Sequence, residues 1–311
     1  MSKRPASPAA SSSSSSSGDS EPSFINVDFL FSSPSALDYH ALKRLTQQLF
    51  YTHAAHLDLG AIAQETIDAA GKWGSVVKVD QQSEEGGEEE DPYAFVGAFD
   101  LAASTAASQS LRAYFLARSA SCASISSLLA SSSADAANAA ASPSTLLVLH
   151  ERMVNLPPAI ALPLYRMLFD EIAASPTQPD NLLFFSRIFN ADAFSDDEMS
   201  DAEGGDAEDK PRGMKGAAKK RRKAAASLKT AKTAPPPKAR LAEGEYGLFH
   251  PEDAVFAQFA SHTHTFRFPP PPDAAEAFEA PLFGRLVVVP WRQAGEMLQR
   301  LEALLAQGGA A

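Results

Sequence analysis

A stretch near the middle of the chain, residues 145–172, constrains the fold more than any other. An apolar run from Thr145 to His150 ends in a charged pair, and a Val-Asn-Leu link then leads to Pro157-Pro158. The run predicts a buried strand, and the apolar spacing after the prolines predicts a helix. We expect Asn155 to cap this helix, with Pro157 in its first turn. Pro163 implies a kink, or a helix that begins near Leu162.

Further strands and helices alternate along the chain without a repeat, which predicts one α/β domain with helices packed on a central sheet. Asp38 and Asp58 are placed to cap the first two helices. Ser119 to Ser144 is rich in Ser and Ala and contains few bulky residues, and we expect it to be weakly packed. Strands are expected at Phe24–Phe31, Ser75–Val79, Tyr93–Leu101, Leu182–Phe189, His262–Phe268 and Leu286–Val289. The remaining helices are expected after Asp38 and Asp58, at Gln109–Arg118, at Glu252–Phe259 and at Trp291–Ala306.

Four segments contain too few large apolar residues to form a core, and we expect them to be disordered. Residues 80–91 hold seven acidic residues, and Asp192 to Asp209 holds nine. Lys210 to Arg240 follows with twelve basic residues and no acidic one. We therefore expect a folded body at residues 23–307 that is interrupted by an acidic loop and by a long acidic-then-basic insertion. The four segments outside the folded core are the Ser/Ala/Pro-rich tail 1–22, the loop 80–91, the insertion 190–243 and the short tail 308–311.

The net charge of −11 disfavours binding to nucleic acid phosphates and favours basic proteins as partners. The single cysteine, Cys122, has no internal partner for a disulfide, which indicates a reducing compartment. No apolar run of about 18 residues is present, so we expect no membrane insertion. The first residues lack the apolar segment of a secretory signal.

Candidate interaction sites lie in the charged segments. A five-residue basic block in a segment expected to be extended predicts a nuclear import signal, although it is also explained as a solvated charge run. The acidic residues are candidate contacts for a basic client, or they keep the protein in solution. Two serines before acidic residues are candidate phosphorylation sites, Ser195 and Ser200. The basic block is Lys219, Lys220, Arg221, Arg222 and Lys223. The candidate client contacts are Glu84, Glu85, Glu88, Glu89, Glu90, Asp91, Asp196, Asp197 and Glu198.

No catalytic, metal-binding or cofactor-binding motif is found. The sequence contains no P-loop, no G-x-G-x-x-G after a strand, no G-x-S-x-G and no H-E-x-x-H. His262 and His264 share one face of an expected strand, but neither Cys nor carboxylate completes a ligand set, so we expect them to pack in the strand. His53 and His56 at the end of a helix likewise form no site. We therefore expect no catalytic residue, no metal and no cofactor.

Four blocks in the chain resemble, in the same order, those of the BCCIP family of nuclear proteins. Glu151–Tyr165 has the sequence ERMVNLPPAIALPLY and is similar to the double-proline block of that family, which is the most specific of the four. Gly74–Lys78 resembles its G-[ST]-x-[IV]-K strand, and Val27–Phe29 its opening V-[DE]-F strand. Leu286–Pro290 with the final helix resembles its closing strand and helix. Together the blocks span nearly all of the expected folded body.

The resemblance implies a fold like that of the GCN5-related acetyltransferases, with a mixed, splayed central sheet and helices on both faces. It implies a non-enzymatic protein of the nucleus, with possible shuttling to the cytoplasm. Fungal members resemble chaperones of a basic large-subunit ribosomal protein that also support nuclear export of a phosphatidylinositol phosphate kinase, which makes nuclear transport receptors expected partners. No specific nucleic acid binding is implied.

Two alternatives remain open at this point. Animal members of the family resemble cell-cycle and DNA-repair scaffolds, so a scaffold without chaperone activity is one alternative. An acetyl-CoA-dependent acyltransferase is the other, but the Q/R-x-x-G-x-G/A loop that would hold the cofactor pyrophosphate is missing from the sequence. Fold alone does not imply that activity.

Overall fold

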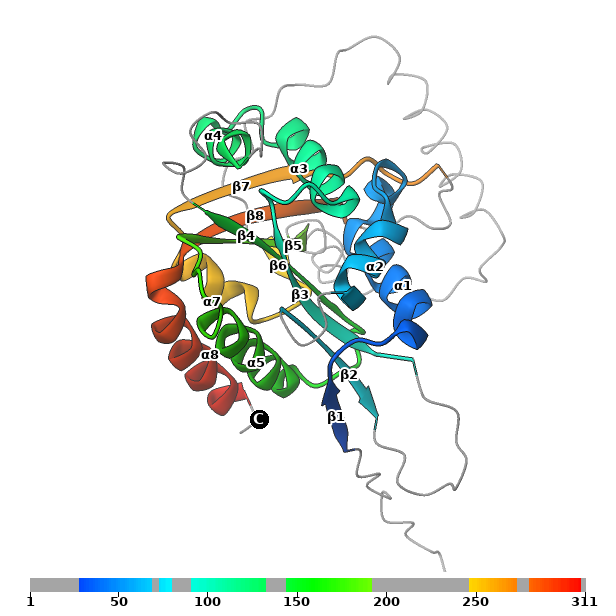
Figure 1. Ribbon diagram of the computed structural model, residues 1–311, viewed down its shortest axis with the longest axis vertical. Coiled ribbons are helices and arrows are strands. Elements are labelled where there is room, and N and C mark those ends of the chain that lie inside the picture. Colours follow the sequence, from blue (N-terminus) through cyan, green and yellow to red (C-terminus); the bar gives the residue numbers. More distant parts are fainter. Residues whose placement is uncertain are drawn as a thin grey trace, which may run out of the picture.

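A mixed sheet of eight strands forms the centre of the protein (Figure 1). Its strand order is β1-β2-β3-β4-β5-β8-β7, and β6 pairs with β5 outside this path. Among the described strands, only β4 and β5 pair in parallel. The computed structural model describes residues 28–68, 73–79, 91–132, 144–191, 246–272 and 280–308. The strands are β1 (Phe29–Ser32), β2 (Gly74–Val79), β3 (Ala94–Asp100), β4 (Thr145–Arg152), β5 (Asn181–Asn190), β6 (Tyr246–Leu248), β7 (His262–Arg267) and β8 (Leu282–Pro290).

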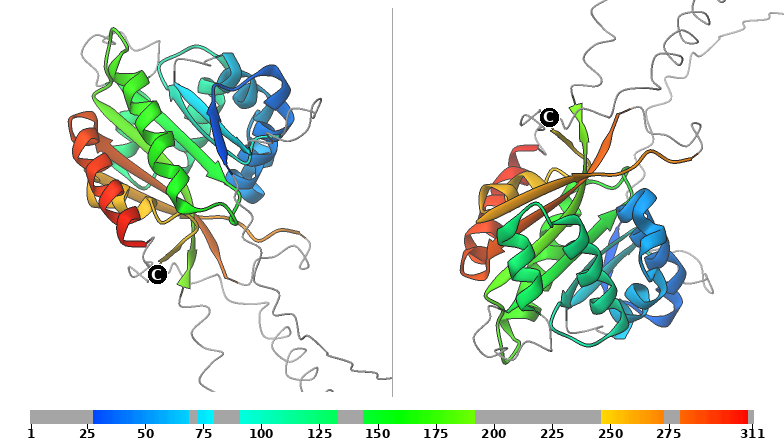
Figure 2. Two further views of the ribbon diagram at one scale, coloured as in Figure 1. Left: turned by 90° about the horizontal axis from the view of Figure 1, so that it is seen from below. Right: turned by 90° about the horizontal axis from the view of Figure 1, so that it is seen from above.

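Helices cover both faces of the sheet, as Figures 1 and 2 show. One apolar core lies under the N-terminal helices α1 to α4, and a second lies under α5, α7 and α8. Because both faces are covered, β2, β3 and β4 are buried along almost their whole length. The prediction of one α/β domain with helices on a central sheet is confirmed. The helices are α1 (Tyr39–Phe50), α2 (Leu59–Asp68), α3 (Ala106–Arg118), α4 (Ala123–Ser131), α5 (Ala161–Ala173), α7 (Asp253–Gln258) and α8 (Ala294–Gly308).

The sheet opens between its two parallel strands. β4 pairs with β5 from Thr145 to Leu149, but its last residues, 150–152, pair only with β3 on the other side. The far end of β5 is instead paired by the short strand β6, through residues 188–190. The two strands therefore separate toward their carboxyl ends. This opening is the place where the polar residues described below gather.

The turn after β4 differs from the sequence prediction. A 3-10 turn at Pro158–Ile160 comes first, and α5 begins at Ala161. Asn155 is exposed and lies before this turn, so it does not cap the helix, and that prediction is wrong. Pro157 has extended backbone and precedes the turn, as a residue before another proline prefers. Pro163 is the third residue of α5, where its missing N–H leaves no helical hydrogen bond unmade.

The two aspartates predicted as helix caps behave differently. Asp58 does cap α2, because its Oδ1 accepts a hydrogen bond from the amide of Ala61 at 2.9 Å. Asp38 precedes α1, but its side chain makes no capping bond to that helix. Its carboxylate instead pairs with the buried Lys78 of β2 at 2.8 Å and accepts from the amide of Ser35. The prediction for Asp38 is therefore wrong, because a buried cation attracts the carboxylate more strongly.

The Ser/Ala-rich stretch is packed more closely than its composition suggested. It forms α4 at Ala123–Ser131, and its large apolar residues Ile125 and Leu129 are fully buried. Cys122, just before this helix, is partly buried against the same core. The expectation of weak packing is wrong for residues 119–132. Small side chains let α4 approach its neighbours closely, and two bulky residues are enough to anchor one side of it.

Several predictions lie outside the described residues. They include the tail 1–22, all of the acidic loop except Asp91, the basic block Lys219–Lys223, and Ser195 and Ser200. The first half of the strand expected from Phe24 also lies there, while Phe29 and Phe31 are partly buried as predicted. Within the ranges that are described, no helix is long and apolar enough to cross a membrane.

Candidate functional site

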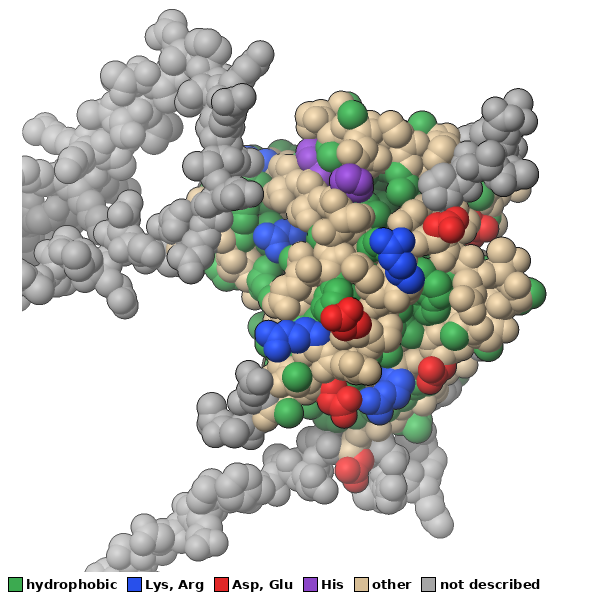
Figure 3. Space-filling view, turned by 90° about the vertical axis from the view of Figure 1, so that its left-hand side faces the viewer, with side chains coloured by type: hydrophobic (Ala, Val, Ile, Leu, Met, Phe, Trp, Pro, Cys, Tyr) green, Lys and Arg blue, Asp and Glu red, His purple; other side chains and the backbone are tan. Residues whose placement is uncertain are grey.

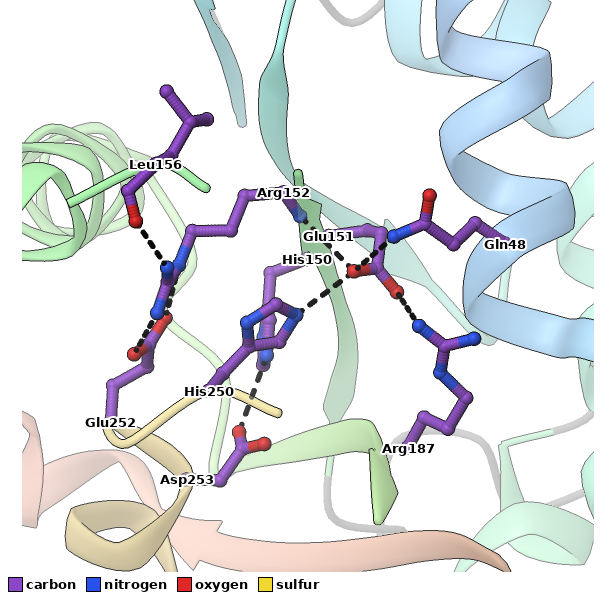
Figure 4. A network of polar contacts seen from close by, with 9 residues as sticks. All are labelled: Gln48, His150, Glu151, Arg152, Leu156, Arg187, His250, Glu252 and Asp253. Atoms are coloured by element: carbon purple, nitrogen blue, oxygen red, sulfur yellow. Dashed lines mark hydrogen bonds and ion pairs between the residues drawn. The ribbon is translucent and has the colours of Figure 1, made fainter. Parts of the chain in front are cut away.

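The opening between β4 and β5 is the first place to look for a ligand. In open α/β sheets, ligands bind in the crevice outside the carboxyl ends of the strands, where neighbouring strands diverge. Here the crevice is occupied by charged side chains of the protein itself (Figure 4). We call this group of residues the crevice cluster. It comprises His150, Glu151 and Arg152 of β4, Arg187 of β5, His250, Glu252 and Asp253 before and at the start of α7, and Gln48 of α1.

The strongest contact in the crevice cluster joins Arg152 to Glu252. Two nitrogens of the guanidinium group, Nη2 and Nε, contact the two carboxylate oxygens at 3.0 and 3.3 Å. The third nitrogen, Nη1, donates to the backbone carbonyl of Leu156 at 3.1 Å. Both side chains are about 95% buried or more. The pair therefore ties the turn after β4 to a segment that lies 100 residues further along the chain.

Glu151 is the second junction of the cluster. Its Oε1 accepts hydrogen bonds from Gln48 Nε2 at 3.2 Å and from His250 Nε2 at 2.9 Å. Its Oε2 lies 3.7 Å from Nη2 of Arg187, which is an ion-pair contact but not a hydrogen bond. The Arg187 guanidinium also packs 4.5 Å from the ring centre of Phe249. Glu151 thus connects α1, β5 and the segment before α7 on one side of the opening.

His150 completes the cluster on the other side. Its Nε2 lies 3.2 Å from Oδ1 of Asp253, at ion-pair distance although without hydrogen-bond geometry. Burial lowers the pKa of His150, but the carboxylates of Asp253, Glu252 and Glu151 outweigh this effect and raise it above its ordinary value. The composition of the cluster agrees with this direction, since its three carboxylates face only two guanidinium groups.

On the side of His150, Arg152 and Glu252, the crevice leaves no room for a substrate. The cavity that remains beside His150, Arg152 and Glu252 has a volume of about 10 Å³. Such a volume is at the lower limit for a single water molecule. Tyr165 lines the cavity, and burial together with the nearby carboxylates raises the pKa of its hydroxyl well above the ordinary value. The contacts of the cluster therefore hold the diverging strands β4 and β5 in place from inside the protein.

The sequence predictions missed this cluster. The sequence pattern predicts that Glu151 and Arg152 form the charged end of a strand, entering a turn, whereas both are buried within β4. Their partners, His250 to Asp253, lie beyond the long charged insertion, so no local spacing connects them. A usable signal was the position of this charged segment between Leu248-Phe249 and Val255-Phe256, because charged residues enclosed by apolar ones are often buried in pairs.

The remaining histidines do not form a metal site. Nδ1 of His53 lies 2.9 Å from the hydroxyl of Tyr114. Burial, with smaller effects of Arg118 and His56, lowers the pKa of His53 to about 4. His264 packs in β7 and donates from Nε2 to the backbone carbonyl of Arg118 at 2.9 Å, as a strand-packing residue. Among the described residues, no group of three or more His, Cys, Asp or Glu is arranged to hold a metal ion.

Of the acidic residues predicted to contact a client, only Asp91 is described. Its Oδ2 forms a 2.8 Å ion pair with Nη2 of Arg44, and both side chains are more than half exposed. The others, Glu84 to Glu90 and Asp196 to Glu198, lie in parts of the chain that the structure does not describe.

Two larger hollows lie on the surface. The first, the arginine groove, has a volume of about 680 Å³ and lies beside the crevice cluster. Its cations Arg44 and Arg187 are already paired, with Asp91 and Glu151 respectively. At its edge Tyr51 has a positive φ of 48°, a conformation rare for any residue but glycine. The arginine groove is lined by Arg44, Leu45, Gln47, Gln48, Tyr51, Thr52, Pro92, Met153, Arg187, Pro271 and Pro272.

The second hollow, the acidic cleft, has a volume of about 750 Å³. It lies where β3 ends, β4 begins and α5 ends, and Trp73 forms part of its wall. Its lining contains three carboxylates and, within the described residues, neither Lys nor Arg. The lining residues are Trp73, Asp100, Ser144, Thr145, Leu146, Asp170, Glu171, Ala174, Ser175, Pro176, Thr177, Gln178 and Pro179.

Comparisons of the sequence with a family model and with individual proteins point to the same family. A sequence model of the BCCIP family matches residues 24–256. Protein BCP1 of Mycosarcoma maydis is 43% identical over 318 residues, which cover 93% of this chain and 91% of that protein. Protein bcp1 of Emericella nidulans is 29% identical over 248 residues, which cover 78% of this chain and 72% of that protein.

A solved structure supports the fold. The crystal structure of BCP1 from Saccharomyces cerevisiae matches with a TM-score of 0.55 and 19% sequence identity, over 93% of each chain. At this identity the likeness concerns the fold alone. It does not test the resemblance to the GCN5-related acetyltransferases, which stays a prediction.

Proposed function

This chain belongs to the BCCIP family, and from that premise we propose that it is a nuclear chaperone and adaptor without catalytic activity. Its client is a basic protein of the large ribosomal subunit. It also supports export of protein cargo, such as a phosphatidylinositol phosphate kinase, with the help of nuclear transport receptors.

One observation carries the non-enzymatic part of this proposal. The crevice where a ligand of this type of sheet would bind is filled by the crevice cluster, and the cavity that remains measures about 10 Å³. A substrate could enter only by breaking buried contacts such as Arg152–Glu252. These buried ionisable side chains are thus engaged in holding the fold, which leaves the outer surface as the functional part.

The charge of the chain supports a basic client. The net charge is −11, and carboxylates compete with nucleic acid phosphates for the Lys and Arg side chains of ribosomal proteins. The negative charge is not spread evenly over the surface of the protein. The face beside β7 and α8 carries acidic and basic side chains intermixed, without a large patch of one sign (Figure 3). A basic client is therefore expected to bind at a more local acidic surface and at the acidic segments of the chain.

The proposed location of the protein in the nucleus rests on the basic block Lys219–Lys223. Replacing all five residues with alanine should move a fluorescent fusion from the nucleus toward the cytoplasm. A matched variant with Lys229, Lys232 and Lys238 replaced by alanine should stay nuclear. A five-alanine fusion that remains nuclear would show that import depends on another signal or on a bound partner.

The chaperone function can be tested with purified full-length protein. Candidate basic ribosomal proteins of the large subunit are diluted from denaturant with or without it, and the soluble fraction is measured at roughly 0.5 M salt, where exposed charge pairs are screened. We expect one such protein to stay soluble in a defined complex. If none does, and if depletion of the chain in cells leaves ribosomal protein solubility unchanged, the scaffold alternative is favoured. A rise in melting temperature on addition of acetyl-CoA would instead favour the acyltransferase alternative.

A further inference from the structure

The acidic cleft has the dimensions and lining of a binding site. Its volume of about 750 Å³ lies within the range of roughly 300–1,000 Å³ typical of ligand pockets. The walls are partly apolar, with the half-buried ring of Trp73, the side chain of Leu146 and the ring of Pro179. Apolar walls with a few charged groups suit a long side chain that carries its charge at the tip.

The carboxylates of the cleft have no cationic partner among the described residues. Asp100 accepts a hydrogen bond from the amide of Ala102 at 2.8 Å, and Glu171 accepts from the amide of Gly74 at 3.1 Å. None of Asp100, Asp170 and Glu171 forms an ion pair within the part of the chain that is described. This differs from the arginine groove, where both cations are neutralised by a carboxylate.

The end of α5 adds to the negative potential. The C-terminal end of a helix carries partial negative charge, which favours cations and disfavours carboxylates nearby. Asp170 and Glu171 nevertheless stand in the last turn of this 13-residue helix, and that turn contains no basic residue. The pKa of Glu171 is raised above its ordinary value, mainly by burial and to a smaller extent by the nearby carboxylate of Asp170. The hydrogen bond from the amide of Gly74 lowers this pKa but does not cancel the rise. The free protein thus holds two negative charges where they are unfavourable, and a bound cation would relieve this.

A metal ion does not fit this arrangement, because no group of three such ligands in the described structure is arranged to hold one. An aliphatic stem with a cationic head fits both the walls and the carboxylates. Trp73 provides an aromatic surface for the head or stem. We propose that the acidic cleft receives a lysine or arginine side chain from an extended basic segment of the client. This inference rests on the proposed function and assigns it a site.

The test uses full-length protein and a short fluorescein-labelled peptide in which lysine and arginine alternate with serine. Fluorescence anisotropy gives its affinity. The cleft variant carries Asp100→Asn, Asp170→Asn and Glu171→Gln, which remove three charges while keeping side-chain shape. A matched control carries Asp28→Asn, Glu296→Gln and Glu302→Gln, three exposed positions that do not line the cleft.

We expect the cleft variant to bind the peptide at least roughly tenfold more weakly, because charge-assisted contacts are lost. The control should change affinity by less than about twofold, because exposed distant charges are screened. Equal weakening in both variants would overturn the proposal, as would unchanged binding by the cleft variant. Since the carboxylates of the wild-type cleft have no cationic partner among the described residues, the cleft variant should melt at the same temperature as the wild type or higher, which excludes misfolding as the cause.

A second readout is local. With Trp291→Phe, Trp73 is the only tryptophan left, so its emission reports on the cleft. Adding the basic peptide should change this emission, and a peptide with glutamine at the basic positions should not. The experiments distinguish a wrong assignment of the cleft as the binding site from a wrong proposed function. If the cleft variant holds the ribosomal client as tightly as wild type, only the site is wrong; if wild type holds no such client, the proposed function is wrong.

Discussion

The crevice cluster makes a quantitative prediction about stability, centred on the pair Arg152–Glu252. Replacing Glu252 with leucine leaves the guanidinium group buried without a counter-ion, while only the carbonyl of Leu156 still accepts from it. Breaking a buried pair in this way costs about 3–5 kcal/mol. For a folded body of this size, that corresponds to a melting temperature lower by roughly 6–20 °C. Arg152→Met should cost a similar amount, because it leaves Glu252 unpaired.

The double variant Arg152→Met with Glu252→Leu separates this explanation from simple loss of packing. Replacing a buried ion pair by apolar residues of similar volume is often close to neutral. We therefore expect the double variant to be more stable than either single variant, by about 2 kcal/mol or more, in urea unfolding followed by circular dichroism. The exposed pair Arg166–Glu302, with its nitrogen and oxygen 3.6 Å apart, serves as the control. Breaking it should cost less than about 1 kcal/mol.

The reasoning is refuted if the single variants at Arg152 and Glu252 lose no more stability than the control. It is also refuted if the double variant loses the sum of the two single losses, since the two side chains would then act independently.

Two further predictions concern His150 and Gly284. Because the pKa of His150 is raised in the folded protein, its stabilising effect is fully present below the ordinary value of 6.5 and is lost as pH rises through the folded value. The free energy of unfolding should therefore fall as pH rises above about 6.5, by at most about 1.4 kcal/mol per pH unit, and His150→Gln should flatten this slope. A Cβ atom at Gly284 would lie 2.6 Å from Phe266 and 2.8 Å from Phe185, so Gly284→Ala should cost about 1–3 kcal/mol in urea unfolding. The control Gly295→Ala meets nothing within 4 Å and should not destabilise, and an equal loss in both variants would contradict the packing argument.

The elements of the fold could be predicted because their signals are local. The helix expected at Trp291–Ala306 is found as α8, and its Ala294, Met297 and Leu301 are buried. The start of α5 could not be placed as well, because a double proline is compatible both with the first turn of a helix and with an extended segment followed by a 3-10 turn. In this chain the second arrangement is found, and Asn155 is left outside the helix.

The crevice cluster and the acidic cleft were harder to predict, for a physical reason. Arg152 and Glu252 are separated by 100 positions and by a long charged insertion, so no periodicity connects them. Charge at the end of an apolar run ordinarily indicates a solvent-exposed turn, and only the separation of β4 from β5 makes burial possible here. The acidic cleft is likewise assembled from β3, β4 and the end of α5. Sequence reasoning pointed instead to the acidic segments, of which Asp91 alone is described.

The central claim is that the folded protein holds a basic client without changing it chemically. It is tested most directly by incubating the purified full-length chain with the proposed basic ribosomal client and acetyl-CoA, and recording native and intact-protein mass spectra. We predict a stable complex that survives roughly 0.5 M salt during purification and a client of unchanged covalent mass. A client that gains mass on incubation, or that never forms a complex, would contradict the account.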